Sequence, residues 1–204
     1  MSAPSKTMRE YEETAAVFAF HLLFYWMFRL TGQNIFFWGG GFCLLLIMEI
    51  ALRRRSLSVV GFRWPTNKKV LWIFAIALAL FFAFGALVHV LFEIEWHYLN
   101  QNFWSGVVLG PLVEEIVFRG LIQTRLETAL GNTKSWILSS ILFSLYHIIA
   151  WFIISGKVVS AYTITQLVGV SLAGMFMGIS RAKTKSLLPP FLLHAVNNFI
   201  AFLT

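Results

Sequence analysis

The sequence predicts an all-α fold, a polytopic bundle of about seven transmembrane helices in one membrane domain. Composition is the first observation behind this prediction: 58% of the 204 residues are hydrophobic and 12% are charged, about half of the ~25% charge of soluble domains. The second is that the hydrophobic residues form long continuous runs, unlike the alternating pattern of a membrane β-barrel. The third is that basic residues cluster between these runs.

Seven apolar runs are candidate spans. Two precede the most basic connection, at residues 14–30 and 34–52. Five follow it, at residues 70–92, 103–130, 135–154, 158–179 and 187–203. We therefore divide the chain into residues 1–69, with a polar tail, two spans and the basic loop, and residues 70–204, with the other five spans.

Glycine and proline mark several ends of these runs. Gly110-Pro111 interrupts the fourth run, where we expect a break because proline lacks a backbone donor. Gly131-Asn132 follows the same run and is a typical helix stop. Pro189-Pro190 opens the last run, and proline is tolerated in a first helical turn.

The basic residues indicate the orientation in the membrane. The formal charge is +7, and two connections are the most basic: residues 53–69, and the segment that holds Arg181, Lys183 and Lys185. Under the positive-inside rule both are cytoplasmic, with the N-terminus in the cytoplasm and the C-terminus outside. The same rule explains the charge without nucleic acid as a partner. Because the chain and its loops are short, we expect an integral protein of a bacterial cytoplasmic membrane, in contact with the lipid bilayer.

The fourth run contains three ionisable residues within six positions: Glu114, Glu115 and Arg119. Charges inside a membrane are costly, so an ionisable residue there is a candidate functional residue. On a helix, Glu115 and Arg119 lie on one face and can pair. Glu114 is turned by about 100° from Glu115, so it is less able to share this pairing. We therefore expect Glu114 to be the carboxylate that does chemistry.

Other polar residues lie within the later runs. His147 lies in the fifth run, and His194 lies near the start of the seventh, with Asn198 four residues further on the same face. Helix rise places these residues and Glu114 between the midplane and the cytoplasmic side, where they could meet. The alternative is structural, because such side chains can also be hydrogen-bonding contacts between helices.

The motifs Glu114-Glu115-x-x-x-Arg119, Phe143-x-x-x-His147 and His194-x-x-x-Asn198 follow one another on successive predicted helices. Together they resemble the CAAX-processing and bacteriocin-processing (CPBP, or ABI) family of intramembrane endopeptidases of the glutamic type. The resemblance covers roughly residues 70–203 and implies that the last five spans form the catalytic core. It also implies a membrane-associated protein or peptide substrate, cut near its C-terminus or within its membrane segment.

The resemblance implies a role for each matched residue. Glu114 would be the general base that activates water, and His147 would hold or polarise that water. His194 and Asn198 would stabilise the oxyanion of the tetrahedral intermediate. Glu115, Arg119 and Phe143 would support the site. A carboxylate in a site of low dielectric constant suits a general base, and preset donors suit acyl transfer.

Several alternatives stay open. No cofactor is favoured, but Glu114, His147 and His194 could also bind zinc as a two-histidine, one-carboxylate site. Other intramembrane protease types fit less well, because the chain has no aspartate and no His-Glu-x-x-His motif. The chain could instead be a non-catalytic immunity or regulatory protein of the same fold. A small transporter or proton relay is a weaker reading, because no internal repeat is visible.

Overall fold

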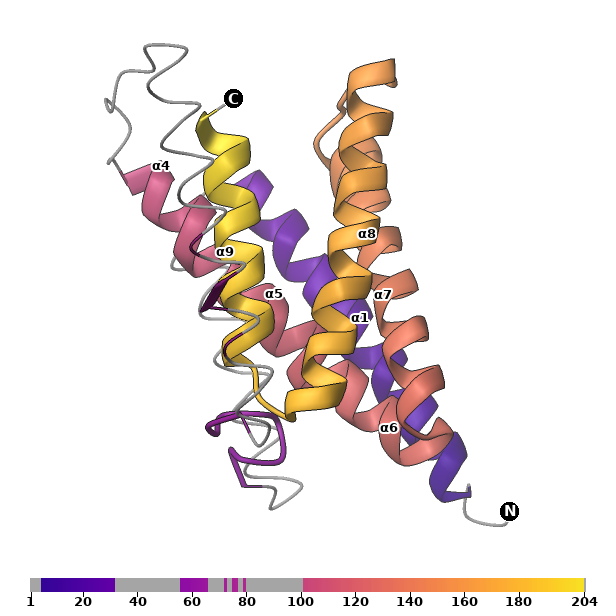
Figure 1. The fold of residues 1–204 in the computed structure, drawn as a ribbon. Helices are drawn as coiled ribbons and strands as arrows, with labels where there is room; N and C mark the ends of the chain where they lie inside the picture. The colour runs from indigo at the N-terminus through magenta and orange to yellow at the C-terminus, as the bar shows by residue number, and fades with distance from the viewer. Residues whose placement is uncertain are drawn as a thin grey trace.

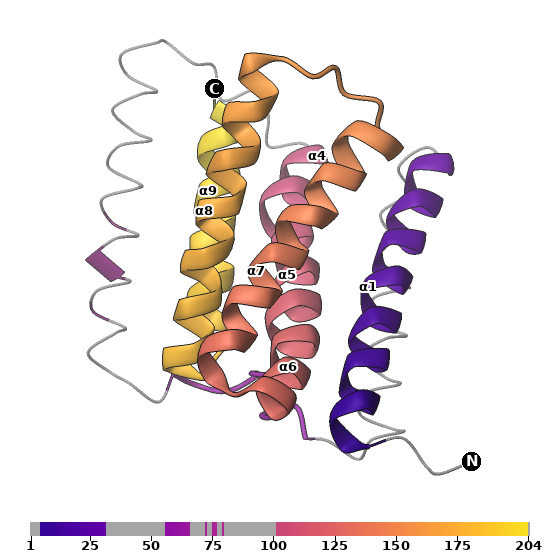
Figure 2. The same cartoon turned by 90° about the vertical axis from the view of Figure 1, so that its right-hand side faces the viewer.

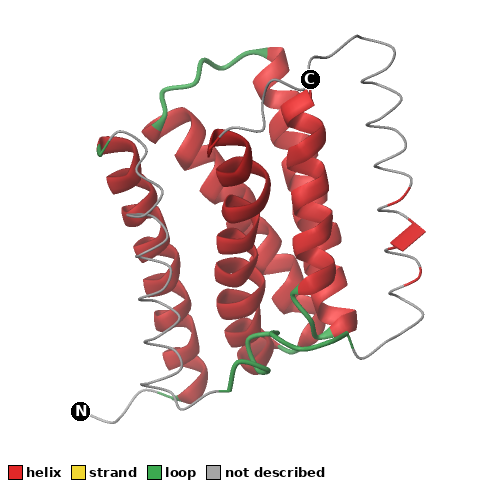
Figure 3. Cartoon of the chain, turned by 90° about the vertical axis from the view of Figure 1, so that its left-hand side faces the viewer, coloured by secondary structure: helices red, strands yellow, loops and turns green. Residues whose placement is uncertain are grey.

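The computed structural model describes residues 5–31, 56–65 and 101–203, together with the isolated positions 72, 75, 76 and 79. Within these ranges the chain is helical with short loops and contains no strand (Figure 3). The all-α prediction is therefore confirmed for this part of the chain. The predicted span at residues 34–52 and nearly all of 70–92 lie outside the described residues, so the count of seven spans stays a prediction.

The described helices pack side by side in a bundle (Figure 1; Figure 2). Helix α1 packs against α6. Helix α7 packs against α6 and α8, and α9 packs against α8 and α5. Three stretches, η1, η2 and η3, have the wider π-helical winding. The bounds are α1 Lys6–Leu30, α4 Gln101–Trp104, η1 Ser105–Leu109, α5 Gly110–Glu115, η2 Ile116–Ile122, α6 Gln123–Leu130, α7 Asn132–Ile148, η3 Ile149–Ile154, α8 Ala161–Thr184 and α9 Leu188–Leu203.

Helix α1 begins earlier than the predicted start at residue 14. The side chain of Ser5 caps it by accepting from the Met8 amide at 3.2 Å. Glu13, in the added polar turns, lies 3.7 Å from the Arg125 guanidinium of α6. Further along, His21 is buried and packs on the Tyr146 ring at 4.7 Å between centroids. Tertiary contacts therefore hold both the polar start and the apolar part of α1.

Residues 101–130 form one continuous helical path, so the predicted break at Gly110-Pro111 is wrong. Gly110 keeps helical dihedrals, and its N–H bonds the Ser105 carbonyl, five residues back, as in a π-helix. Pro111 then falls in the first turn of α5, where its missing N–H is tolerated. The change of winding accommodates the proline without ending the helix.

Small residues bring α8 close to α7. A Cβ added to Gly174 would lie 2.9 Å from the Phe143 ring, and one added to Gly178 would lie 2.9 Å from Ser140 Oγ. The same approach lets Ser140 Oγ donate to the Gly174 carbonyl at 3.0 Å. Contacts of this kind are typical of helix pairs in membranes, where small residues let backbones approach closely.

Helix α8 extends past the predicted end at residue 179 and includes two residues of the predicted basic loop. Arg181 and Lys183 lie in its last turn, where cations are favoured by the helix dipole. Lys185 ends the helix in the left-handed conformation, with φ at 56°, and its N–H bonds the Arg181 carbonyl. Favourable end interactions thus continue the helix beyond the apolar run.

Two helical stretches in the described part of the chain are long and apolar enough to cross a membrane, Asn132–Ile154 and Ala161–Thr184. Their outer surfaces support this assignment, because large apolar side chains are exposed at spacings of three or four residues. Contiguous exposed apolar surface is unusual for a soluble monomer and is expected against lipid. These side chains are Ile137, Ile141, Leu145 and Ile148 on α7, and Ile164, Val168, Leu172 and Phe176 on α8.

Candidate active site

Glu114 lies near the middle of the helical path 101–130, between the π-helical segments η1 and η2. Its Oε2 atom is 3.8 Å from His147 Nε2 and 3.7 Å from His194 Nε2. The same oxygen is buried and has no hydrogen-bond partner among the described residues. Helices α5, α7 and α9 thus bring one carboxylate oxygen and two imidazole nitrogens together, although the residues are far apart in sequence.

His147 is oriented by its own helix. Its Nδ1 atom lies 3.0 Å from the Phe143 carbonyl, one turn back. A carbonyl oxygen only accepts, so Nδ1 must carry the proton of this hydrogen bond. In the neutral ring, Nε2 then has a lone pair, and this is the nitrogen that faces Glu114.

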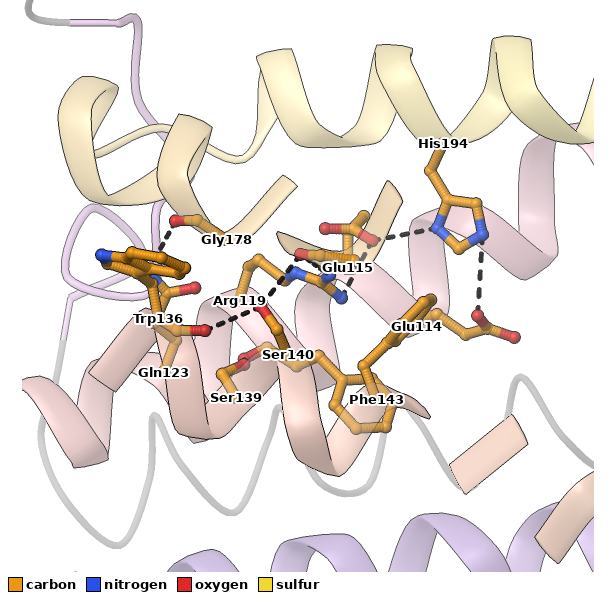
Figure 4. A network of polar contacts seen from close by, with 12 residues as sticks. Glu114, Glu115, Arg119, Gln123, Trp136, Ser139, Ser140, Phe143, Gly178 and His194 are labelled. Carbon is orange, nitrogen blue, oxygen red and sulfur yellow. Dashed lines mark hydrogen bonds and ion pairs between the residues drawn. The ribbon is translucent and has the colours of Figure 1, made fainter. Parts of the chain in front are cut away.

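His194 lies between the two adjacent carboxylates (Figure 4). Its Nδ1 atom is 2.9 Å from Glu115 Oε1, while its Nε2 atom faces Glu114. Glu115 also lies 3.3 Å from Arg119 Nη1, as the four-residue spacing predicted, and both side chains are fully buried. Glu115 therefore connects the arginine to the imidazole, a contact to His194 that the sequence did not reveal.

Besides its pairing with Glu115, Arg119 makes two further contacts. Its Nη2 donates to the Gly174 carbonyl of α8 at 2.8 Å, and its guanidinium lies 4.3 Å from the centre of the Phe143 ring. The Phe143 ring in turn packs against His147 at 4.5 Å and His194 at 5.6 Å between centroids. Phe143 thus separates the buried cation from the two histidines and packs against all three.

Asn198 lies one turn after His194 on α9 and completes the group. Its Nδ2 donates to the Gly106 carbonyl in η1 at 3.0 Å. Glu114, His147, His194 and Asn198 all line one cavity of about 530 Å³. The structure therefore brings the four candidate residues together around a single space.

Comparison with known protein families shows which family the chain belongs to. Residues 96–200, about half of the chain, match the family described as Rce1-like, type II CAAX prenyl endopeptidase Rce1-like. The chain belongs to the Rce1-like family. Searches of curated proteins and of solved structures found no match. The match contains all seven residues that the sequence analysis selected for the site, and it confirms the resemblance on which their assignment rested.

Members of the Rce1-like family are integral membrane proteins, and the two candidate spans agree with this location. Membership supports a hydrolase, a CAAX-type intramembrane endopeptidase acting on membrane-associated protein substrates. Helix α1 lies before the matched region, yet Tyr25 and Phe28 of α1 line the cavity. The Tyr25 hydroxyl also lies 3.2 Å from Ser155 Oγ, which ties α1 to the end of η3.

Sequence reasoning missed several residues of the candidate site. Gly106 and Gly174 contribute backbone carbonyls, and no side-chain pattern could have identified these acceptors. Trp151 and Gln166 line the cavity from η3 and α8. The one available signal was glycine in the sixth run, because small residues at Gly169, Gly174 and Gly178 are typical of close helix approach.

π-Helical winding surrounds the site. Segments η1 and η2 flank the two glutamates, and η3 begins two residues after His147. Such segments insert extra backbone into a turn and occur often at functional sites, where they redirect side chains. Glu114 and His147 each lie two residues before a π-helical segment, η2 and η3 respectively.

The residues present fit zinc in their chemistry but less well in their spacing. Two imidazole nitrogens and a carboxylate are a common donor set, and hydrogen bonds at the opposite ring nitrogens are typical of zinc-binding histidines. Tetrahedral zinc places its ligand atoms about 3.3 Å apart, whereas the two Glu114–histidine separations are 3.7 and 3.8 Å. Within the described ranges, no group of three His, Cys, Asp or Glu residues is close enough to hold a metal ion.

Proposed function

We propose that the protein is an intramembrane endopeptidase of the glutamic type that cuts a membrane-associated protein near its C-terminus or within its membrane segment. The observation that carries this proposal is the position of Glu114 Oε2, within 3.8 Å of both histidine Nε2 atoms. The buried oxygen faces a cavity that is large enough to admit an extended peptide segment and water.

The first step is removal of a proton from water. Glu114 accepts this proton, and His147 holds the water by accepting its other hydrogen at Nε2. This role follows from the hydrogen bond between His147 Nδ1 and the Phe143 carbonyl, because the single proton of the neutral ring is on Nδ1 and leaves Nε2 as an acceptor. The water oxygen then attacks the carbonyl carbon of the substrate, forming a tetrahedral intermediate with an oxyanion.

His194 and Asn198 stabilise that oxyanion. Asn198 uses one amide hydrogen for the Gly106 carbonyl, and the second is available to the oxyanion. His194 donates from Nδ1 to Glu115, so it can also donate from Nε2 only when the ring carries both protons. With that ring charged, the site before reaction is neutral, because the carboxylates of Glu114 and Glu115 face one guanidinium and one imidazolium. Preset donors of this kind supply a large share of the catalysis of acyl transfer.

Collapse of the intermediate completes the reaction. The proton that Glu114 took from water passes to the leaving nitrogen, the carbon–nitrogen bond breaks, and a carboxylic acid and an amine are released; the acid then loses its proton to solvent. Glu114 returns to its ionised form. The cycle needs only water and substrate, so we propose that no cofactor takes part.

The test is Glu114→Gln, which keeps the size of the side chain and removes its ability to accept the proton. We expect cleavage to fall by about 10²- to 10⁴-fold while the protein stays folded and membrane-inserted. Mass spectrometry of new C-termini in membranes from expressing cells measures cleavage without a known substrate. A prenylated CAAX peptide, which the family description suggests, serves as the first defined substrate.

Glu12→Gln is the matched control, because it makes the same change on the exposed side of α1. It should leave cleavage unchanged. Undiminished cleavage by Glu114→Gln would refute the assignment of the base. A cellular activity that survives both Glu114→Gln and His194→Ala would instead favour the non-catalytic immunity or regulatory role.

Chelation tests the zinc alternative. Because the proposed cycle uses no metal, dialysis against a zinc chelator should leave turnover unchanged. If activity is lost and is restored by adding zinc, Glu114, His147 and His194 are metal ligands, and the role of the base must be reassigned. Measuring the metal content of the dialysed protein distinguishes true removal of zinc from failure of the chelator to reach the site.

A further inference from the structure

A second cavity of about 340 Å³ lies along α6, beyond η2 from Glu114. It forms where the segment 56–65 packs against the ends of α6 and α8. Three basic side chains, one acidic side chain and three hydroxyl groups line it. The lining residues are Ser58, Val59, Arg63, Thr124, Glu127, Thr128, Arg181 and Lys185.

The walls of this cavity are fixed by hydrogen bonds between distant segments. The Leu187 amide donates to the Gly61 carbonyl at 2.9 Å, and Ser186 Oγ donates to the Arg63 carbonyl at 2.6 Å. Gly61 has φ at +103°, and a Cβ there would lie 2.9 Å from the Leu187 side chain. Only glycine therefore fits at position 61 in this conformation, and hydrogen bonds between distant segments hold the walls of the cavity.

Arg181 is the residue that indicates a ligand. It is only 3% exposed. Its Nη2 atom donates to the Val59 carbonyl and to Thr124 Oγ1, each at 3.2 Å. Its Nε and Nη1 atoms are buried without a hydrogen-bond partner among the described residues. Buried donors of a charged group are costly when unsatisfied, and oxygen atoms of an anion in the cavity would satisfy them.

The charges in the cavity favour an anion. Lys185 is paired with Glu127 and also donates to Asn132 at 3.3 Å. Arg63 donates from Nε to the Lys185 carbonyl at 2.8 Å, which fixes its guanidinium beside the cavity. Glu127 also attracts the Arg181 guanidinium, but the lining as a whole carries three basic side chains against one acidic side chain. Arginine is the side chain best suited to two-point contact with phosphate.

The depth of the cavity fits the head-group region of a bilayer. Glu127 is about 20 Å along the helical path from Glu114, at 1.5 Å per residue. Arg181 lies in the last turn of α8, a candidate span, at the end that also carries the predicted cytoplasmic loops. A site at this level is accessible to lipid head groups and to soluble phosphates.

We propose that this cavity binds a phosphate group, contributed by an anionic phospholipid or by a soluble phosphate. The site is separate from the active site and does not depend on the catalytic proposal. A bound phosphate would connect the segment 56–65 to the end of α8 and so stabilise the fold at this end of the bundle.

The test uses the full chain purified in detergent and its thermal unfolding midpoint. Dioctanoyl phosphatidic acid and inorganic phosphate are titrated separately, with dioctanoylglycerol as the probe that lacks phosphate. We expect saturable stabilisation by the phospholipid, and Arg63→Gln and Arg181→Gln should each weaken it by about tenfold or more. Equal binding of inorganic phosphate would identify a soluble phosphate as the source, and binding of the phospholipid alone would identify a head group.

Lys183→Gln is the matched control, because Lys183 is exposed in the same helical turn but does not line the cavity. It should leave the binding of both probes unchanged. Arg63 is exposed, so its variant tests the site even if Arg181→Gln fails to fold. Absence of saturable stabilisation by either phosphate probe, or an equal loss in Lys183→Gln, would overturn the proposal.

Discussion

At the residue scale, the site depends on a buried chain of contacts from Arg119 through Glu115 to His194. Glu115 accepts from the imidazole at 2.9 Å and lies 3.3 Å from the arginine, so one carboxylate contacts both side chains. Removing one member leaves a buried charge without its partner, which costs more than the pair itself contributes. This chain therefore both stabilises the fold and sets which nitrogen of His194 faces the cavity.

Arg119→Ala tests this dependence. We expect a loss of about 3–5 kcal/mol in the free energy of unfolding, because Glu115 stays buried without its cation. Thermal unfolding in detergent measures the effect. Arg9→Ala is the control, since Arg9 is 71% exposed and pairs with Glu13 at the surface, and its loss should leave the midpoint unchanged. Equal midpoints for the two variants would show that the buried pair is not structural.

At the element scale, α8 holds the site by its close approach to α7. Gly174 contributes the carbonyl that receives Arg119 Nη2 and Ser140 Oγ, and its missing side chain makes room for Phe143. A larger residue at this position would push on the ring that packs against both histidines. The spacing of the two helices and the geometry of the site are therefore linked through one glycine.

Gly174→Ala should lower the thermal unfolding midpoint, because its Cβ would lie 2.9 Å from a Phe143 ring atom. Overpacking of this kind costs about 1–3 kcal/mol. Gly169→Ala is a matched control on the same helix, since nothing lies within 4 Å of its added Cβ. We expect the control to be neutral or slightly stabilising, because alanine favours a helix. A Gly174→Ala protein as stable as this control would contradict the assigned packing.

At the scale of the whole molecule, loops gather at the two ends of the bundle (Figure 2; Figure 3). The start of α1, segment 56–65 and the α8–α9 connection share one end, and the α7–α8 connection lies at the other. This arrangement agrees with the alternation expected from the basic clusters, although the orientation in the membrane stays a prediction.

Cysteine labelling tests that orientation. The chain has one cysteine, Cys43, so Cys43→Ser provides a background free of other thiols. In intact cells, a membrane-impermeant maleimide should label Val158→Cys and should not label Lys183→Cys, which is expected on the cytoplasmic side. Both positions are exposed, so permeabilised cells should label both and serve as the control. The reverse pattern in intact cells would place the basic end outside.

The sequence by itself determined the features that depend on neighbours along the chain. Long apolar runs required helices, because a helix satisfies its own backbone in lipid. The four-residue spacing of Glu115 and Arg119 allowed their pairing, which is confirmed. Local reasoning was wrong at Pro111, because π-helical winding before the proline could not be inferred from composition.

Only the tertiary structure decided which polar groups meet. It placed His194 between two carboxylates, paired Asn198 with the Gly106 carbonyl and enclosed Arg181 in a second cavity. The physical reason is that these contacts join helices far apart in sequence, and their geometry depends on helix approach and rotation. A long apolar run predicts that a helix forms, but close packing of small residues and backbone acceptors determines which of its side chains share a site.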